Sequence, residues 1–372
     1  MSEPGLIALP MHGEVKLRNE GYRTRDGHVL EWIQRLRPDL PVTVRSRPEP
    51  FPRVSLARRH GFANPDWRWE SPQPLTVPPL RAKREWWVKS LRFEPSAQAS
   101  YDAAIVWNPI AGAHLLDRTV QAGRVVVDLL DDWSVHVAFE PIHPQLEKAY
   151  ARVFDLADVI TANSEGTVKL AARFGHEAVL LTNGVDAARF EAAGDSRTGD
   201  AQIVVGYAGK LSERLDLEMV TGVATRLPEV RFDIAGPLTS ATPKADREIR
   251  GALESQPNIR LLGDIPYERL PQLIATWDIG WVPHRIGKFE VGGDVIKTYE
   301  YRAAGLPTVI TPIIGAERAP DGVSVVASAD DAVSAIEAIT GSDSRPPRIP
   351  ADLPESMSWR EKTGRLLDAL GV

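Results

Sequence analysis

The chain of 372 residues contains no cysteine. Disulfide scaffolds, cysteine nucleophiles, zinc fingers and iron–sulfur clusters all need thiols and are therefore excluded. No two glycines are separated by a single residue, so the pattern G-x-G-x-x-G is absent, and G-x-x-x-x-G-K-[ST] does not occur either. NAD-type Rossmann enzymes and P-loop NTPases thereby lose their principal support.

Long apolar runs are also missing. No stretch approaches the roughly 18 apolar residues that a membrane span requires. The first residues, MSEPGLIALPMHG, lack the charged leader and long apolar segment of a secretory signal. We therefore expect a cytoplasmic protein. The eight histidines show no metal-ligand spacing with carboxylates and H-E-x-x-H is absent, so we expect no catalytic metal.

The net charge of −6 is unevenly spread. Between Arg45 and Arg92 there are eleven Lys and Arg residues against four acids, which leaves +7 in this segment and −13 in the rest of the chain. Such an asymmetry concerns a surface and its partners rather than the fold. We expect no nucleic acid partner.

Residues 78–93 mix Trp86, Trp87 and Phe93 with several cations. One hypothesis is therefore a peripheral contact with the anionic inner face of the membrane. The alternative is that the tryptophans pack against the core, while the cations are solvated or line the pocket of an acidic acceptor.

Short β-branched runs alternate with helical patterns along most of the chain, which predicts parallel sheets covered on both faces. The expected strands are 103–107, 124–130, 158–163, 203–209, 230–236, 259–263, 279–283 and 307–311. The expected helices include 144–157, 165–175, 215–227, 270–277 and 358–372. The fold class is therefore α/β, with two Rossmann-like domains.

A small, polar segment at 187–200 is interpreted as the linker between the two domains, and 340–356 as an exposed connection. The expected domains are 1–188 and 189–355, and a final helix is expected within 356–372.

Three strand ends in the second domain carry groups suited to a sugar nucleotide. The first strand runs into a turn with Gly209, Lys210 and Arg214, ahead of a helix, and such turns are natural phosphate sites. By spacing alone, the sequence slightly favours a solvated cation pair near a helix start. Glu300 lies on a helix after two glycines and is suited to a ribose diol, or else is a solvated helix residue. The third strand end, 263–271, has a backbone turn suited to a base edge.

Several motifs in this order carry a resemblance: ITANSEGTV, LLTNGVDAARF, VGYAGKLSERLD, FDIAGP, NIRLLGDIPYERLPQLI, DIGWVP and DVIKTYEYRAAGLPTVIT. Together they resemble the retaining GT-B glycosyltransferases of the GT4 group. The resemblance covers residues 155–320 and the C-terminal helix well, and 1–100 poorly. It implies two domains that face each other across a cleft, with 1–188 on the acceptor side and 189–355 binding the donor. The final helix, within 356–372, would cross back and pack on the first domain.

The resemblance also implies site residues. Lys210 and Arg214 match the cationic pair on the donor diphosphate, one residue closer together than usual, and Glu300 matches the ribose ligand. Gly292 stands where many relatives carry a further Glu, and Glu290 is a neighbouring carboxylate that reaches the donor hexose. The complete expected donor-binding set is Gly209, Ile265, Pro266, Glu290, Asp294, Val295, Ile296, Lys297 and Glu300.

In the first domain, the buried strand 124–130 is followed by two acids and a histidine. The resemblance implies that residues at this strand end lie near the reacting sugar. Asp132 and His136 are expected to take part in catalysis together with Lys210 and Arg214. The acceptor side is expected to include His12, Gly13, Arg25 and Asp131. Capped loops with solvated acids fit the same residues.

The implied reaction moves a hexosyl group from a nucleotide diphosphate sugar to an acceptor hydroxyl. The anomeric configuration would be retained, and neither a metal nor a further cofactor would take part. A saccharide, a lipid-linked molecule or a small molecule would be the acceptor. Three alternatives stay open: a GT-B nucleotide-sugar epimerase, a non-catalytic nucleotide-sugar-binding partner, and an unrelated Rossmann-type enzyme.

Overall fold

A computed structural model describes residues 5–21, 23–50, 67–197, 202–240, 242–287, 293–316, 322–341, 345–349 and 353–372. By its contacts the chain divides into two compact units. Unit 1 comprises Met1–Asn183, Val291–Asp294 and Trp359–Val372, and unit 2 comprises Gly184–Glu290 and Val295–Ser358. The chain therefore passes between the units at 183/184, whereas the sequence analysis places the boundary at 188/189.

Unit 1 is built on a parallel sheet, in which seven strands are described, in the order β3-β2-β1-β4-β5-β6-β7. Every pair of neighbours is parallel, as expected for strands that are buried on both faces. The strands are β1 (Leu6–Leu9), β2 (Val42–Val44), β3 (Arg68–Trp69), β4 (Ala99–Val106), β5 (Val120–Leu129), β6 (Val159–Ala162) and β7 (Val179–Leu180).

The helices of unit 1 bury an apolar stripe against this sheet. They are α1 (Glu14–Asn19), α2 (Arg25–Leu36), α4 (Trp86–Lys89), α5 (Pro109–Leu115), α6 (His143–Asp155), α7 (Glu165–Arg173) and α14 (Trp359–Leu370), with short 3₁₀ turns η1 (Lys83–Glu85), η2 (Ser90–Phe93) and η3 (Val137–Ile142). Side-chain caps fix some of the starts. In α7, for example, Ser164 and Thr167 form a reciprocal capping box.

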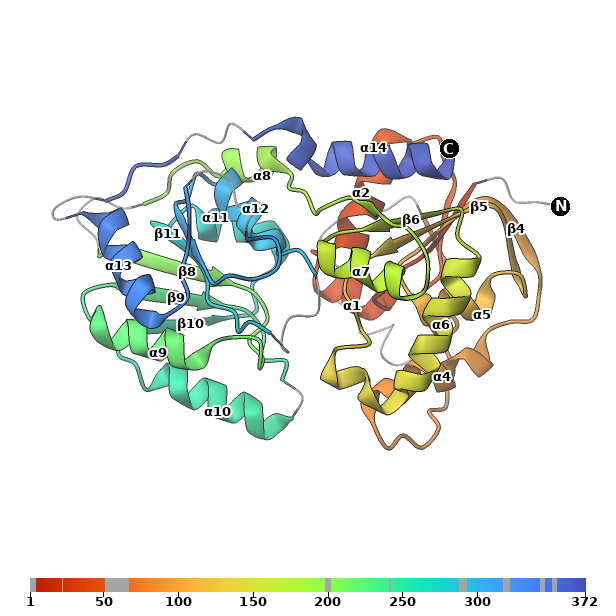
Figure 1. The fold of residues 1–372 in the computed structure, drawn as a ribbon, viewed down its shortest axis with the longest axis horizontal. Coiled ribbons are helices and arrows are strands. Elements are labelled where there is room, and N and C mark those ends of the chain that lie inside the picture. The colour runs from red at the N-terminus through yellow and green to blue at the C-terminus, as the bar shows by residue number, and fades with distance from the viewer. Residues whose placement is uncertain are drawn as a thin grey trace. The chain divides into compact units, whose positions relative to one another are not determined.

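The last helix belongs to the first unit. Figure 1 shows α14 beside α2, although the two lie at opposite ends of the chain. The Trp359 indole is fully buried and stacks on His28 of α2, with ring centroids 4.9 Å apart. Burial of this ring and of Leu366 and Leu370 anchors the C-terminus on unit 1.

Unit 2 repeats the architecture with a parallel sheet, in which six strands are described, in the order β10-β9-β8-β11-β12-β13. The strands are β8 (Val204–Ala208), β9 (Arg231–Ala235), β10 (Ile259–Gly263), β11 (Ile279–Val282), β12 (Thr308–Ile310) and β13 (Val323–Val325). The helices are α8 (Ala187–Glu191), α9 (Leu217–Arg226), α10 (Pro243–Glu254), α11 (Leu270–Ile274), α12 (Ile296–Ala303) and α13 (Ala329–Thr340), with 3₁₀ turns η4 (Tyr267–Arg269) and η6 (Glu355–Met357). The two Rossmann-like sheets confirm the predicted fold class.

The predicted linker at 187–200 is wrong in its first part. Residues 187–191 form α8, and Phe190 in this helix is 2% exposed within the core of unit 2. The buried Phe190 ring therefore anchors this segment in the core, although its small and polar composition indicated a linker. Residues 198–200 lie outside the described part of the chain.

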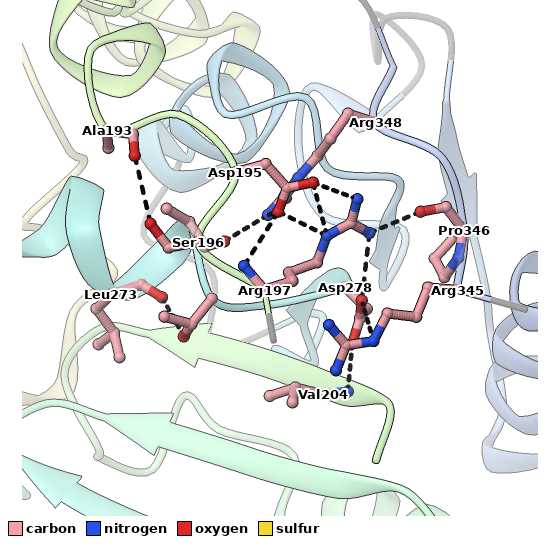
Figure 2. Close-up of polar contacts among 12 residues, drawn as sticks. Ala193, Asp195, Ser196, Arg197, Val204, Leu273, Asp278, Arg345, Pro346 and Arg348 are labelled. Atoms are coloured by element: carbon pink, nitrogen blue, oxygen red, sulfur yellow. Dashed lines mark hydrogen bonds and ion pairs between the residues drawn. The ribbon is translucent and has the colours of Figure 1, made fainter. Parts of the chain in front are cut away.

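The predicted exposed connection at 340–356 is also partly packed. Figure 2 shows the side chain of Arg197 joined to Asp195 and Asp278, while its Nη1 also donates to the carbonyl of Pro346 at 2.7 Å. Asp278 is fully buried and accepts a hydrogen bond from Val204 N at 2.8 Å. Because Val204 begins β8 and Asp278 precedes β11, this network fixes the amino edge of the sheet.

The two indoles on which the membrane hypothesis depends are buried. Trp86 is 8% exposed and donates from Nε1 to Pro48 O at 3.0 Å. Trp87 is 6% exposed and packs edge-on against Trp133 and Phe139. These tryptophans pack in the core of unit 1, as the alternative in the sequence analysis has it, and do not face a bilayer. In the described part of the chain, no helix is both long and apolar enough to traverse a membrane.

Candidate functional site

The candidate site of unit 2 lies where the strand order reverses. In an open parallel sheet, ligands bind beyond the carboxyl ends of the strands at this reversal. The reversal lies between β8 and β11. Lys210 follows β8, and His284 follows β11. The cluster in Figure 2 lies at the opposite, amino edge, so it does not belong to this site.

Glycines bring the backbone together at this carboxyl edge. Gly209 N donates to Ala235 O at 2.8 Å, and Gly236 N donates to Gly263 O at 2.7 Å. A Cβ on Gly236 would lie 1.7 Å from Gly209 O, and its φ of +146° is one that only glycine adopts readily. Residues 209, 236 and 263 thus form a side-chain-free surface at the ends of three adjacent strands.

In the described part of the chain, Lys210, Arg214 and Lys297 lie near the Gly209 turn. Lys210 and Arg214 are half-buried on the segment after β8. The third is Lys297, at the start of α12. A Cβ on Gly209 would lie 2.6 Å from Lys297 Cε, and Lys297 Nζ is 5.4 Å from the centroid of the Tyr207 ring. The predicted residues Gly209, Lys210 and Lys297 are therefore brought together.

A buried Tyr–His pair supports this turn. The hydroxyl of Tyr207 lies 3.1 Å from His284 Nε2 and donates to Lys210 O at 3.2 Å. Burial, together with the charges of Lys297 and Arg214, holds the pKa of His284 well below its usual value. His284 is therefore neutral at pH 7, and it adds no further charge beneath the cations.

Helix α12 is tied to the end of β8 by Tyr301. The Tyr301 hydroxyl accepts a hydrogen bond from Ala208 N at 2.8 Å. Two glycines admit the neighbouring rings, because a Cβ on Gly280 would lie 2.4 Å from the Tyr301 ring and one on Gly206 would lie 1.9 Å from Trp277. These contacts set the position of Lys297 and Glu300 relative to the Gly209 turn.

The two helix starts near the turn differ. Asp216 caps α9, because its carboxylate accepts from Met219 N at 3.1 Å. A carboxylate of the protein itself therefore already accepts a hydrogen bond from the free N–H groups in the first turn of α9. In α12 the N-cap is Val295, which makes no side-chain cap. Of the two helix starts, that of α12 offers its dipole to an external anion.

The remaining donor-side predictions have the following places. Glu300 is 6% exposed, one turn into α12. Ile265 and Pro266 lie in the turn after β10, with Pro266 at the N-cap of η4. Asp294 belongs to unit 1, where its Oδ2 accepts from Asn183 N at 2.8 Å. Glu290 and Gly292 lie outside the described residues.

Arg25, predicted on the acceptor side, is built into a buried ion pair. Its Nε and Nη2 donate to the two carboxylate oxygens of Asp128 at 2.8 and 2.9 Å. Nη1 donates to Thr182 O and Asn183 Oδ1, both at 3.1 Å. Arg25 is 3% exposed and Asp128 is fully buried, so these donors are directed at protein groups.

The His12–Gly13 turn is also satisfied internally. His12 N donates to Asp26 Oδ2 at 3.3 Å, and His12 Nδ1 lies 3.6 Å from the same oxygen. Burial raises the pKa of Asp26, but the contacts with His12 and Thr24 outweigh it and lower that pKa to about 2. Gly13 leaves room for Glu49, since a Cβ there would lie 2.3 Å from Glu49 Oε1.

Asp131, Asp132 and His136 follow β5 in one loop. Asp131 Oδ1 would lie 2.1 Å from a Cβ on Gly293, so these two residues approach closely within unit 1. Asp132 accepts from Ser134 N at 2.9 Å and pairs with Arg173 at 3.4 Å. His136 Nδ1 accepts from Ala138 N at 3.1 Å and caps η3.

Sequence reasoning missed Tyr207, His284 and Tyr301. Tyr207 lies in a strand that was predicted only as part of the core. Tyr301 lies within the DVIKTYEYRAAG motif, directly after Glu300, but was not itself predicted as a site residue. His284 could have been found, because it directly follows a predicted strand, as Lys210 does. Among the described residues, no group of three or more His, Asp and Glu side chains is arranged to hold a metal ion.

The comparisons with known proteins agree with this geometry. Residues 202–341 match the family model described as glycosyl transferases group 1. Solved structures align over nearly the whole chain. HepE of Anabaena, in complex with UDP and glucose, has a TM-score of 0.63 and 14% identity, covering 98% of this chain and 99% of that one. The fold is GT-B.

Sucrose-phosphate synthase of Thermosynechococcus elongatus is a second GT-B neighbour, with a TM-score of 0.68 and 15% identity, covering 99% of this chain and 94% of that one. A teichuronic acid biosynthesis glycosyltransferase of Bacillus subtilis, TuaH, is 27% identical over 232 residues. That match spans 58% of this chain and 57% of the relative. The predicted GT-B fold is therefore confirmed, and the similarity over residues 202–341 supports the resemblance to glycosyltransferases, while the GT4 group and the retaining chemistry stay predictions.

Proposed function

We propose that this protein is a glycosyltransferase that moves a hexosyl group from a nucleotide diphosphate sugar to an acceptor hydroxyl. One observation carries the proposal: Lys210, Arg214 and Lys297 gather at the carboxyl edge of the unit 2 sheet, around the side-chain-free Gly209 turn. The similarity of residues 202–341 to group 1 glycosyl transferases supports it, as does the likeness to a fold that binds UDP in HepE.

The donor diphosphate lies over the Gly209 turn, at the uncapped start of α12. Its charge grows as the glycosidic bond to the sugar breaks, because the leaving oxygen takes the bonding electrons. Lys210, Arg214 and Lys297 stabilise that charge more in the transition state than in the bound donor, which accelerates the reaction. Tyr207 and Tyr301 hold these cations in place through Lys210 O and Ala208 N.

Glu300 binds the ribose diol of the donor. Its carboxylate lies on the same helix as Lys297, one turn further on, and is 6% exposed. A carboxylate accepts two hydroxyl hydrogen bonds at once, and such charge-assisted bonds are about twice as strong as neutral ones. The backbone at Ile265 and Pro266 lies beside the base.

We propose retention of the anomeric configuration, with the leaving diphosphate helping to deprotonate the acceptor hydroxyl. No metal is needed in this scheme, because three cations and the α12 dipole supply positive charge to the diphosphate. Asp132 and His136 are the proposed unit 1 groups near the reacting sugar. Membrane contact through residues 78–93 stays a prediction, which now depends on exposed Leu80 and its basic neighbours.

Incubation with nucleotide-hexoses tests the reaction class. With donor and a panel of acceptors, transfer releases one nucleoside diphosphate for each glycoside formed. Without acceptor, an epimerase would convert the nucleotide sugar into its epimer, whereas a transferase would leave it intact or hydrolyse it slowly. A non-catalytic binding protein would give neither product while still binding the nucleotide.

A further inference from the structure

Two arginines of unit 1 share one aromatic ring. The Arg47 guanidinium carbon lies 4.3 Å from the centroid of the Trp87 ring, and that of Arg84 lies 5.1 Å from it. Arg84 also lies 4.5 Å from the centroid of the Phe139 ring. Two like charges are thus held beside the same buried aromatic ring.

Within the described part of the chain, nothing compensates the charge of the Arg84 side chain. Its guanidinium has neither a hydrogen-bond nor an ion-pair partner there, and its contacts are with the two rings. Burial and the charge of Arg47 lower the pKa of Arg84 to about 10. Holding a cation out of water without a counter-charge is costly, and contacts with ring faces offset only about 0.5–2 kcal/mol of that cost.

Elsewhere the same segment supplies carboxylates where its arginines are buried. Arg45 pairs with Glu94 at 2.8 Å, and both side chains are at least nine-tenths buried. Glu85, next to Arg84 in sequence, pairs instead with Lys89 at 2.7 Å. The missing counter-charge at Arg84 is therefore specific to this place.

The aromatic cluster around the arginines also holds an unused donor. Trp133 is 1% exposed, its ring centroid lies 4.8 Å from that of Trp87, and it stacks on Phe139 at 4.9 Å. Within the described part of the chain, its indole N–H has no hydrogen-bond acceptor. The cluster is thus rich in donors and short of acceptors.

The arginines lie at the carboxyl edge of the unit 1 sheet. Arg47 follows β2 and donates from Nη1 to Met11 O at 3.5 Å, in the segment after β1. Phe139, which contacts Arg84, lies 5.7 Å from the ring of His136, in the loop after β5. Because these strands are parallel, all three segments emerge at the ligand-binding edge.

We infer that Arg47 and Arg84 form a binding site for an anionic group, a phosphate or a carboxylate, carried by the acceptor. Guanidinium groups suit both anions because their planar donors bind two oxygens at once. The assignment to the acceptor rests on the proposed function. The anion site itself does not, since it lies in unit 1 and needs no donor.

Calorimetric titration with inorganic phosphate, at constant ionic strength made up with chloride, tests the site. We expect R84Q and R47Q each to raise the phosphate Kd about tenfold, the loss of one charge-assisted contact. K83Q removes an exposed cation from the same turn and is expected to leave the phosphate Kd within about twofold of the wild type. K210A removes a cation of the proposed donor site, so it identifies any phosphate that binds there instead of at Arg84.

The outcomes separate this inference from the proposed function. Phosphate binding that depends on Lys210 and not on Arg84 would overturn the inference and leave the donor site standing. If phosphate binding depends on Arg84 but the protein binds no nucleoside diphosphate, the anion site is supported and the proposed function is contradicted. The same titration with glucuronate in place of phosphate tests whether the site binds a carboxylate.

A parallel titration with vesicles of phosphatidylcholine and phosphatidic acid distinguishes a lipid-borne phosphate from a free one. Arg84-dependent binding to these vesicles assigns the anion to a lipid, and binding of free phosphate alone assigns it to a soluble acceptor. No Arg84-dependent binding of either kind overturns the inference.

Stability gives a second readout. If Arg84 serves to bind a ligand and not to stabilise the fold, R84Q should keep or raise the melting temperature in buffer without phosphate, because an uncompensated charge is removed. A marked fall would indicate a structural role and count against the site. If R84Q does not fold, R84K keeps the charge, loses the planar fork, and should still weaken phosphate binding.

Discussion

The hydroxyl of Tyr301 accepts a hydrogen bond from the backbone N–H of Ala208 at 2.8 Å. Ala208 ends β8, directly before the Gly209–Lys210 turn, and Tyr301 follows Glu300 on α12. This one contact thus joins the two segments that carry the proposed diphosphate and ribose ligands. Its loss should alter both stability and donor binding.

Tyr301→Phe removes the acceptor and leaves a buried N–H unsatisfied, which should lower the free energy of unfolding by about 1–3 kcal/mol. Urea unfolding at pH 7 measures the change. Tyr101→Phe is the control, because it also removes a tyrosine hydroxyl, one that lies 3.5 Å from Glu70 Oε2 in unit 1 and not at the Ala208 N–H. An equal loss in the two variants would show that the Ala208 contact has no special role.

Lys210→Ala and Arg214→Ala should each reduce kcat more than they weaken binding of the nucleoside alone. Charge on the diphosphate grows as the sugar leaves, so these cations contribute most in the transition state. Loss of one such contact typically lowers the rate by about 10²–10³-fold. Steady-state kinetics with the donor provides the measurement. A variant with wild-type turnover would remove that residue from the proposed site.

Glu300→Gln should weaken binding of ribonucleotides and have much less effect on a 2′-deoxy analogue. The carboxylate is a charged acceptor for the ribose hydroxyls, and its amide replacement loses about 1–2 kcal/mol of that interaction. Calorimetry with the matched pair of nucleotides measures the difference. Equal losses for both would show that Glu300 does not bind the ribose.

His284 should make the protein less stable in mild acid. Folded His284 stays neutral, because burial, Lys297 and Arg214 depress its pKa, whereas the unfolded chain takes up a proton below about pH 6.5. Unfolding therefore becomes easier as the pH falls, by about 2 kcal/mol between pH 6.5 and 5 from this group. His284→Gln should lack that component when unfolding is measured at both pH values. A variant with the full wild-type pH dependence would place the titrating group elsewhere.

The strands were predictable because their β-branched runs are buried on both faces, as at 203–209 and 307–311. The site of unit 2 was predictable in part, since Lys210 and Lys297 follow from motifs next to glycine turns. The buried Tyr207–His284 pair that supports the Gly209 turn was not predictable from the sequence. Whether Tyr207 reaches His284, 77 positions later, depends on which strands are neighbours in the sheet, and the pattern of one strand carries no such information.

The errors have a similar origin. The segment at 187–200 has linker composition, yet one ring, Phe190, is enough to bury it. For Trp86 and Trp87 the sequence left two places open, a membrane surface or the core, and both indoles pack in the core of unit 1. Local composition describes neighbours along the chain, whereas burial depends on neighbours in space.

Binding of nucleoside diphosphates tests the central claim most directly. Thermal unfolding should be measured with UDP, GDP and dTDP, for the wild type and for Lys210→Ala. We expect one of these to stabilise the wild type, by roughly 2.7 kcal/mol at a hundred times its Kd, and to stabilise the variant much less. If none raises the melting temperature, or if Lys210→Ala responds as the wild type does, the claim that unit 2 binds the donor diphosphate at the Gly209 turn is wrong.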